Sequence, residues 1–386
     1  MLGGLEIYGV VVLWRELIIY PYLEEEYRMI LKIRLINLWM VVLVLLIYFI
    51  VRIIEINFKF RLFLLFMRIF FIIKFSDFII FFIVYEIVFI FIIFTIIILG
   101  YRFERLIASY LMIFYSFIFS RPSLILVIMI DKRFLIKSWL NYSFLLIYFL
   151  IASFIVKFPI FGFHYWLPVA HVEASTVGSI ILAGVLLKLG GLGMWYVVRY
   201  ISFMVKFHWM SLAIPMLILI ILRIRDSKIM IAYSSVAHIR IVFYILITGR
   251  SVRKYGVIII IFYHGFISPL MFWVVGVLAW WKTRSLLVIK IISFSYVYLL
   301  VLFFLFIINI GFPPFIGFLR EILILKSLVY LKYVLLLMML RVLFRCYYNI
   351  YLFWCFNNVI GIVFKINFIR LELFIFLLWG LILNFY

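Results

Sequence analysis

The chain has 386 residues, of which 70% are hydrophobic and 22% aromatic, and its mean hydropathy is +1.36. A soluble domain is about half apolar, so this composition excludes a globular protein folded in water and indicates helices buried in lipid. The formal charge of +22 fits basic residues at helix ends that face headgroups. The chain has no separate basic domain or finger spacing, so we expect no nucleic-acid partner.

Windows of about 20 mostly apolar residues predict the transmembrane helices in chain order. The strong windows are 36–54, 77–99, 106–130, 134–157, 176–198, 209–223, 229–248, 256–281, 286–310, 312–330, 331–355 and 362–386, and the weak ones are 7–20 and 60–74. None alternates with a two-residue period, which favours helices over a barrel. We therefore predict an all-α membrane bundle of about 12–14 helices. The opening residues, with Glu6, Arg15 and Glu16, do not resemble a removable secretory or import sequence.

Some ionisable side chains lie deep inside these windows, where each costs at least a few kcal/mol. Glu86 and Lys188 lie near the middle of their windows, and His238 and His264 lie inside two others. A single carboxylate could simply pair with a lysine and hold two helices together, and a lone histidine could be a satisfied polar residue. A set of acids and bases on separate helices is, however, what proton hopping needs, because burial brings carboxyl groups and amines into the range where both exchange protons.

Two further charges lie beside helix-breaking prolines. Lys157 precedes Pro159, and Glu321 follows the proline pair at 313–314. Proline removes a backbone donor and clashes with the preceding turn, so each segment is predicted to contain an interrupted helix. Broken helices with a charge in two separate parts of a chain indicate a transporter built from inverted repeats. The two halves would meet near residues 200–228.

Other kinds of site find little support. His164, His171 and Glu173 are metal-ligand types but lack zinc spacing. The glycine-rich run at 187–193 lies inside an apolar window and is interpreted as helix packing rather than a phosphate loop. The chain has two cysteines, one of them Cys346, and these are too few for a cysteine-ligated cluster. We expect no metal and no haem, flavin or iron–sulfur ligand set in this chain.

The block KFPIFGFHYWLPVAHVEASTVGSIILAGVLLKLGGLG, residues 157–193, resembles the signature segment of chain 4 of NADH:ubiquinone oxidoreductase, respiratory complex I. Further blocks resemble that family in the same order: GYRFERLIASYLMIFYS, DSKIMIAYSSVAHI, FYHGFISPLMFW and GFPPFIGFLREI. We accordingly divide the chain into diverged, shortened N-terminal helices (1–75), an antiporter-like core (76–355) and a C-terminal helix (356–386).

The resemblance implies a proton-translocating subunit of the complex I membrane arm, in the mitochondrial inner membrane. It implies no redox centre in this chain, with NADH, FMN, iron–sulfur clusters and ubiquinone handled elsewhere in the parent complex. The implied partners are antiporter-like chains 2 and 5, small and accessory subunits, and phospholipids such as cardiolipin. The alternatives are a stand-alone or multi-subunit cation/proton antiporter subunit, and a membrane spacer that has lost pumping.

The resemblance also assigns roles to individual residues. The implied proton-transfer residues are the acid of a Glu–Lys pair, its lysine, the central lysine, two relay histidines and a terminal acid: Glu86, Lys157, Lys188, His238, His264 and Glu321. At the last position the related chains 2 and 5 typically carry lysine, which favours chain 4. The chain departs from the family pattern at several positions, namely Val169 for a usual lysine, Ser175 for a usual proline, and the arginines Arg121, Arg240 and Arg320.

Overall fold

A computed structural model describes part of the chain. The described residues are 78–100, 104–129, 144–159, 162–201, 216–217, 219–247, 251–279, 292–293, 296–313, 332–357 and 362–363, with 315, 317–318, 321–322 and 325. The chain separates into two compact units, Met1–Asp77 and Phe78–Tyr386, and every described residue belongs to the second. The windows predicted at 7–20, 36–54 and 60–74 therefore lie outside the described residues.

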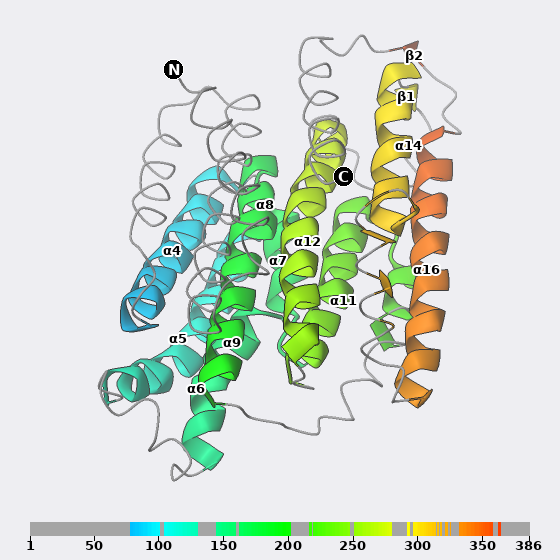
Figure 1. Cartoon of the computed structure of the whole chain (residues 1–386). Helices are drawn as coiled ribbons and strands as arrows, with labels where there is room; N and C mark the ends of the chain where they lie inside the picture. Colours follow the sequence, from blue (N-terminus) through cyan, green and yellow to red (C-terminus); the bar gives the residue numbers. More distant parts are fainter. Residues whose placement is uncertain are drawn as a thin grey trace, which may run out of the picture. The chain divides into compact units, whose positions relative to one another are not determined.

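The second unit is built from helices (Figure 1). They are α4 (Phe78–Leu99), α5 (Arg105–Met129), α6 (Phe144–Lys157), α7 (Trp166–Glu173), α8 (Thr176–Ile181), the π-helical turn η3 (Leu182–Leu186), α9 (Leu187–Ile201), α11 (Ser227–Ile247), α12 (Ser251–Ala279), α14 (Tyr296–Ile310) and α16 (Lys332–Asn357). Within the described part, three segments are long and apolar enough to cross a membrane: Ile79–Ile98, Arg105–Val127 and Thr176–Trp195. The predicted all-α membrane class is confirmed.

Two predicted helical windows, 286–310 and 362–386, each contain a short strand. The strands β1 (Ile292–Ser293) and β2 (Ile362–Val363) pair in parallel, so 292–293 and 362–363 are extended rather than helical. Three of these four residues are β-branched, which favours extended backbone. The pairing joins segments far apart in the sequence, and a local apolar count cannot detect it.

Both predicted helix interruptions are present. Helix α6 ends at Lys157, and Pro159 follows in a turn before α7 begins. The indole Nε1 of Trp166 donates to the carbonyl of Val156 at 2.9 Å, which ties the start of α7 to the end of α6. Helix α14 ends at Ile310, just before Gly311, whose φ of +83° only glycine adopts readily.

Helices α8, η3 and α9 form one helical run, which contains a π turn that the sequence does not predict. Ser175, at a position where the family usually has proline, caps the run: its hydroxyl oxygen accepts from the Gly178 N–H at 3.1 Å. Every residue of α8 and η3 is buried. Because a π turn inserts one extra residue, it changes the direction of the side chains that follow and commonly marks functional sites.

This buried run packs against α12, and α9 also contacts α6, α11 and α4. Helix α12 contacts α11 and α14 as well, and α14 packs on α16 (Figure 1). The glycines of 187–193 permit the close approach: a Cβ built on Gly193 would overlap the Phe154 ring of α6, and one on Gly191 would lie 3.0 Å from both Phe158 and Ile261. The interpretation of this glycine-rich run as helix packing is therefore confirmed.

Candidate functional site

Glu86 and Lys157 form a buried ion pair between α4 and α6. The Lys157 ammonium donates to Glu86 Oε1. The lysine side chain is 1% exposed and the glutamate side chain 18%. Because α6 ends at Lys157, the break before Pro159 places the ammonium at a helix C-terminus, where unpaired carbonyls favour a positive charge.

Two aromatic rings on α4 also surround this ammonium. Lys157 Nζ lies 4.6 Å from the ring centre of Tyr85 and 4.7 Å from that of Phe89. A cation over an aromatic face gains about 0.5–2 kcal/mol, so the rings offset part of the cost of burial. Tyr85 in turn stacks on Phe81 and Phe154. Packed aromatic rings therefore enclose the lysine end of the pair, whereas the glutamate carboxylate is the more exposed end.

Lys188 lies at the start of α9 and is buried. Its ammonium donates to the carbonyl of Ala183 within the π turn and, at 3.3 Å, to the hydroxyl of Ser268. It also lies 3.0 Å from Nδ1 of His264, on α12. Two of these three contacts, the carbonyl and the hydroxyl, are to neutral groups. The contact with His264 is the one that allows exchange, because a lysine and an imidazole within hydrogen-bonding distance can share one proton.

The two predicted relay histidines lie together. The rings of His238, on α11, and His264 have their centres 5.2 Å apart. Both histidines and Lys188 line one small cavity, and Phe158 contributes to the same lining. Phe158 directly follows Lys157 in the chain, so a residue next to the Glu86–Lys157 pair lines this cavity.

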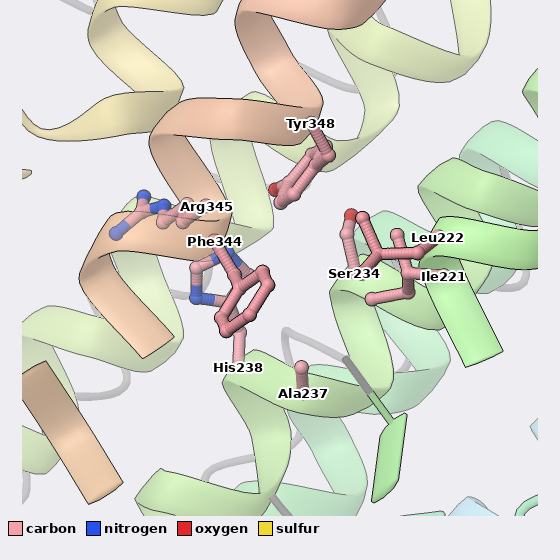
Figure 2. A pocket seen from close by; sticks show the side chains of 8 residues that line it. All are labelled: Ile221, Leu222, Ser234, Ala237, His238, Phe344, Arg345 and Tyr348. Carbon is pink, nitrogen blue, oxygen red and sulfur yellow. The ribbon is translucent and has the colours of Figure 1, made fainter. Parts of the chain in front are cut away.

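His238 also lines a second cavity, which is bounded by α11, α16 and the short helical segment 219–223 (Figure 2). Its lining includes Ser234 of α11 and Phe344, Arg345 and Tyr348 of α16. Figure 2 shows the side chains of Phe344 and Tyr348 facing α11 across this space. One histidine thus borders both cavities.

Glu321 forms a buried ion pair with Arg345, one of the residues that line the second cavity. Arg345 Nη1 donates to Glu321 Oε1, and the two side chains are 2% and 13% exposed. The predicted terminal acid therefore faces a fixed positive charge, which the sequence analysis did not identify. Arg320, the departure from the family pattern next to Glu321, lies outside the described residues.

A polar network fixes α16 against α14. Asn309 of α14 donates to Tyr348 Oη at 3.2 Å and to Asn349 Oδ1 at 2.9 Å. Asn349 in turn donates to the backbone carbonyl of Arg345 at 2.8 Å. Since all these groups are buried, moving α16 along α14 would leave several polar atoms without partners.

The sequence did not point to one further buried charge, Lys228, and offered no explanation for an exposed one, Arg121. Lys228 donates to the carbonyls of Ala174, at 2.7 Å, and Val172, at 3.4 Å, and so stabilises the end of α7. Arg121 is exposed on α5, and its guanidinium lies 3.5 Å above the Phe117 ring. Cation–π stacking explains how that charge is accommodated.

The six predicted site residues thus form three neighbouring groups. Glu86 pairs with Lys157, Lys188 contacts His264 beside His238, and Glu321 pairs with Arg345. Among the residues that the structure describes, no group of three or more His, Cys, Asp or Glu side chains could hold a metal, so His164, His171 and Glu173 are not assembled as ligands. His171 instead stacks on Phe272, with ring centres 4.3 Å apart.

Solved structures share this fold. A chain of the archaeal membrane-bound sulfane sulfur reductase gives a TM-score of 0.71 at 16% identity, over 90% of this chain and 81% of that chain. Respiratory complex I from Thermus thermophilus with bound NADH gives 0.69 at 18% identity, over 92% and 78%. The Mrp complex from Dietzia sp. DQ12-45-1b gives 0.64 at 14% identity, over 73% and 57%. The fold is that of an antiporter-like membrane subunit.

Residues 75–347 match the family described as NADH:quinone oxidoreductase/Mrp antiporter, transmembrane, and the chain belongs to that family. NADH-ubiquinone oxidoreductase chain 4 of Apis mellifera ligustica is 33% identical over 307 residues, which cover 74% of this chain and 68% of that protein. Chain 4 of Ascaris suum is 34% identical over 66% of this chain. The chain spans 64% of the Ascaris protein and 61% of its Locusta migratoria counterpart. The resemblance to chain 4 is confirmed.

Proposed function

We propose that this chain is a proton-translocating subunit of the membrane arm of NADH:ubiquinone oxidoreductase, in the mitochondrial inner membrane. The observation that carries the proposal is a series of buried ionisable groups along two adjoining cavities. His238 lines both cavities. Proton transfer needs acids and bases within hydrogen-bonding reach or one water apart. Membership of the family and similarity to chain 4 proteins support the assignment.

In this proposal each group holds or passes a proton. The Glu86 carboxylate takes up a proton on its more open side, which weakens its attraction for the Lys157 ammonium. The change in charge beside Phe158 then favours loss of a proton from Lys188 to His264 Nδ1, 3.0 Å away. His264 and His238 pass the proton toward the second cavity, and the acceptor beyond it is the Glu321 carboxylate, which pairs with the cavity-lining Arg345.

The energies involved are compatible with pumping. Moving one proton against about 150 mV costs roughly 3.5 kcal/mol. At an effective dielectric constant of about 20, separating a buried ion pair from about 3 Å to about 8 Å changes its Coulomb energy by roughly 3.5 kcal/mol. Opening or closing the Glu86–Lys157 pair is therefore sufficient to drive one transfer.

The proposal places the electron chemistry in other subunits. NADH, FMN, iron–sulfur clusters and ubiquinone belong to the parent complex, and this chain contributes proton-carrying side chains alone. Its neighbours are antiporter-like chains 2 and 5, small and accessory subunits, and phospholipids such as cardiolipin. Broad apolar faces on α4 and α5, including Ile90, Phe94, Tyr110 and Phe114, suit contact with lipid or with such subunits.

The test uses the assembled complex in sealed inner-membrane vesicles. Glu86→Gln keeps a hydrogen-bonding group beside Lys157 but removes the titratable oxygen. We expect assembly and NADH oxidation to persist while protons moved per NADH fall. Exposed Arg121, changed to Gln, is the matched control and is expected to pump normally. Normal pumping by an assembled Glu86→Gln complex would overturn the assignment.

A second candidate is a cation/proton antiporter subunit outside complex I. The similarity of the fold to a chain of an Mrp complex favours it. Native mass spectrometry of the complex in mild detergent separates the two candidates. Co-migration with redox subunits supports the first, whereas a complex without them that exchanges protons under a sodium gradient supports the second.

A further inference from the structure

We propose that Arg345 is an electrostatic gate for protons: paired with Glu321 it closes the path beyond His238, and proton passage requires its guanidinium to swing away. This inference rests on the proposed proton-translocating function and adds a residue to which neither the sequence pattern nor the family resemblance gives a role. Arg345 is a positioning residue in this account, because it acts through Glu321.

The chemistry of the Arg345 side chain supports a gate. Arginine keeps its proton under all ordinary conditions, so Arg345 cannot relay a proton as lysine or histidine does. A fixed positive charge in a narrow path repels protons, which is how pores that must exclude them are built. Arg345 is buried and paired with the terminal acid, so its charge acts with little screening by water.

The position of Arg345 also supports a gate. Arg345 lines the same cavity as His238, and its Nη1 donates to Glu321. His238 in turn lies beside His264. A proton that leaves the histidines for Glu321 therefore meets a carboxylate whose oxygen is already occupied by a guanidinium.

Within the described part of the chain, the Arg345 guanidinium has unused donors, and the cavity that it lines contains a hydroxyl acceptor. A single nitrogen of Arg345 donates to Glu321, while Nε and Nη2 have no hydrogen-bond partner among the residues that the structure describes. In Figure 2 the guanidinium points away from Ile221, Leu222 and Ser234, so the gate requires it to rotate into the cavity. There the Ser234 hydroxyl, which donates to the Ile231 carbonyl at 2.7 Å, retains lone pairs that can accept from the guanidinium.

Hydrogen bonds fix the backbone at Arg345, so the proposed motion involves the side chain alone. Asn349 donates to the Arg345 carbonyl and accepts from Asn309 of α14. The switch is therefore a rotation of one long side chain between the Glu321 carboxylate and the cavity, without movement of α16. When the guanidinium moves into the cavity, the Glu321 carboxylate loses this neighbouring positive charge and binds a proton more readily. When the guanidinium returns, the path behind that proton is closed.

The experiment measures passive proton leak and protons pumped per NADH in vesicles that carry the assembled complex. Arg345→Gln is expected to raise the leak, after an acid pulse without NADH, on the order of tenfold, because the barrier charge is gone. Arg345→Lys restores a positive charge and is expected to leak less than Arg345→Gln. The double variant Arg345→Gln with Glu321→Gln removes the acceptor and is expected to return the leak to that of the wild type. Arg121→Gln, the same change on an exposed helix face, is expected to leave the leak unaltered.

The outcomes separate the gate from the function on which it rests. A leak in Arg345→Gln that equals the wild type, or a double variant that leaks as much as the single one, would overturn the gate and leave the proposed function standing. Full pumping by Glu321→Gln alone would overturn the proposed function and the gate with it. If Arg345→Gln does not assemble, Ser234→Ala provides the test. Losing the cavity acceptor is expected to slow pumping about fivefold with no added leak, and an unchanged pumping rate would overturn the gate.

Discussion

Separating the Glu86–Lys157 pair is predicted to affect stability unequally, depending on which partner is removed. Glu86→Leu leaves a lysine side chain that is 1% exposed without its counter-charge, whereas Lys157→Met leaves a glutamate side chain that is 18% exposed. Breaking a fully buried pair costs about 3–5 kcal/mol. The Tyr85 and Phe89 rings, 4.6 and 4.7 Å from the ammonium, offset about 1 kcal/mol of this by cation–π attraction, so we expect about 3 kcal/mol for Glu86→Leu.

For Lys157→Met we expect about 1–2 kcal/mol, because the remaining carboxylate is less enclosed and can bind a proton and become neutral. The double variant, with leucine and methionine, is expected to lie within about 1 kcal/mol of the wild type, since replacing both charges by apolar groups is often neutral. The assay is the thermal unfolding midpoint of the purified complex, where about 3 kcal/mol corresponds to a fall of roughly 5 °C or more. Equal falls for the two single variants, or additive falls in the double variant, would refute the reasoning.

Three further predictions concern packing and single hydrogen bonds. Gly193→Val places side-chain atoms into the Phe154 ring, so we expect loss of assembly on a native gel. The control is Gly162→Ala, where a Cβ meets no neighbour within 4 Å. This variant is expected to assemble despite some backbone strain. Trp166→Phe removes the bond to the Val156 carbonyl and is expected to cost about 1 kcal/mol in thermal unfolding, with no change if that bond is dispensable. Ser268→Ala removes one acceptor of the Lys188 ammonium and is expected to change the pumping rate up to about fivefold without stopping it. Complete loss of pumping would contradict the view that the Ala183 carbonyl and the His264 ring hold this ammonium in place.

The sequence predicted those features for which the physical cause is local. Proline disfavours the interior of a helix, so Pro159 and the pair at 313–314 predicted the breaks after Lys157 and after Ile310. Pro122 and Pro269, in contrast, lie inside α5 and α12 without ending them. Likewise a charge within an apolar window needs a partner, which singled out Glu86 and Lys188. The partners of both are present, as the Lys157 ammonium and the His264 ring.

Features set by contacts between distant segments could not be predicted. Arg345 lies in a helix that contains several basic residues, and nothing in the local pattern distinguishes the one that meets Glu321, 24 positions earlier. The π turn at Leu182–Leu186 arises in an ordinary apolar run, and its role becomes visible only through the Ala183 carbonyl that holds Lys188. The short β1–β2 pairing similarly depends on two segments that meet in space.

The central claim is that protons cross the membrane through Lys188 and its neighbours, and Lys188→Met tests it most directly. Methionine fills a similar volume without a titratable group, so the helices should still pack. The measurement is the number of protons moved per NADH oxidised by the assembled complex in sealed vesicles. Our account predicts intact assembly with a reduced ratio, and an unchanged ratio in the assembled variant would contradict it.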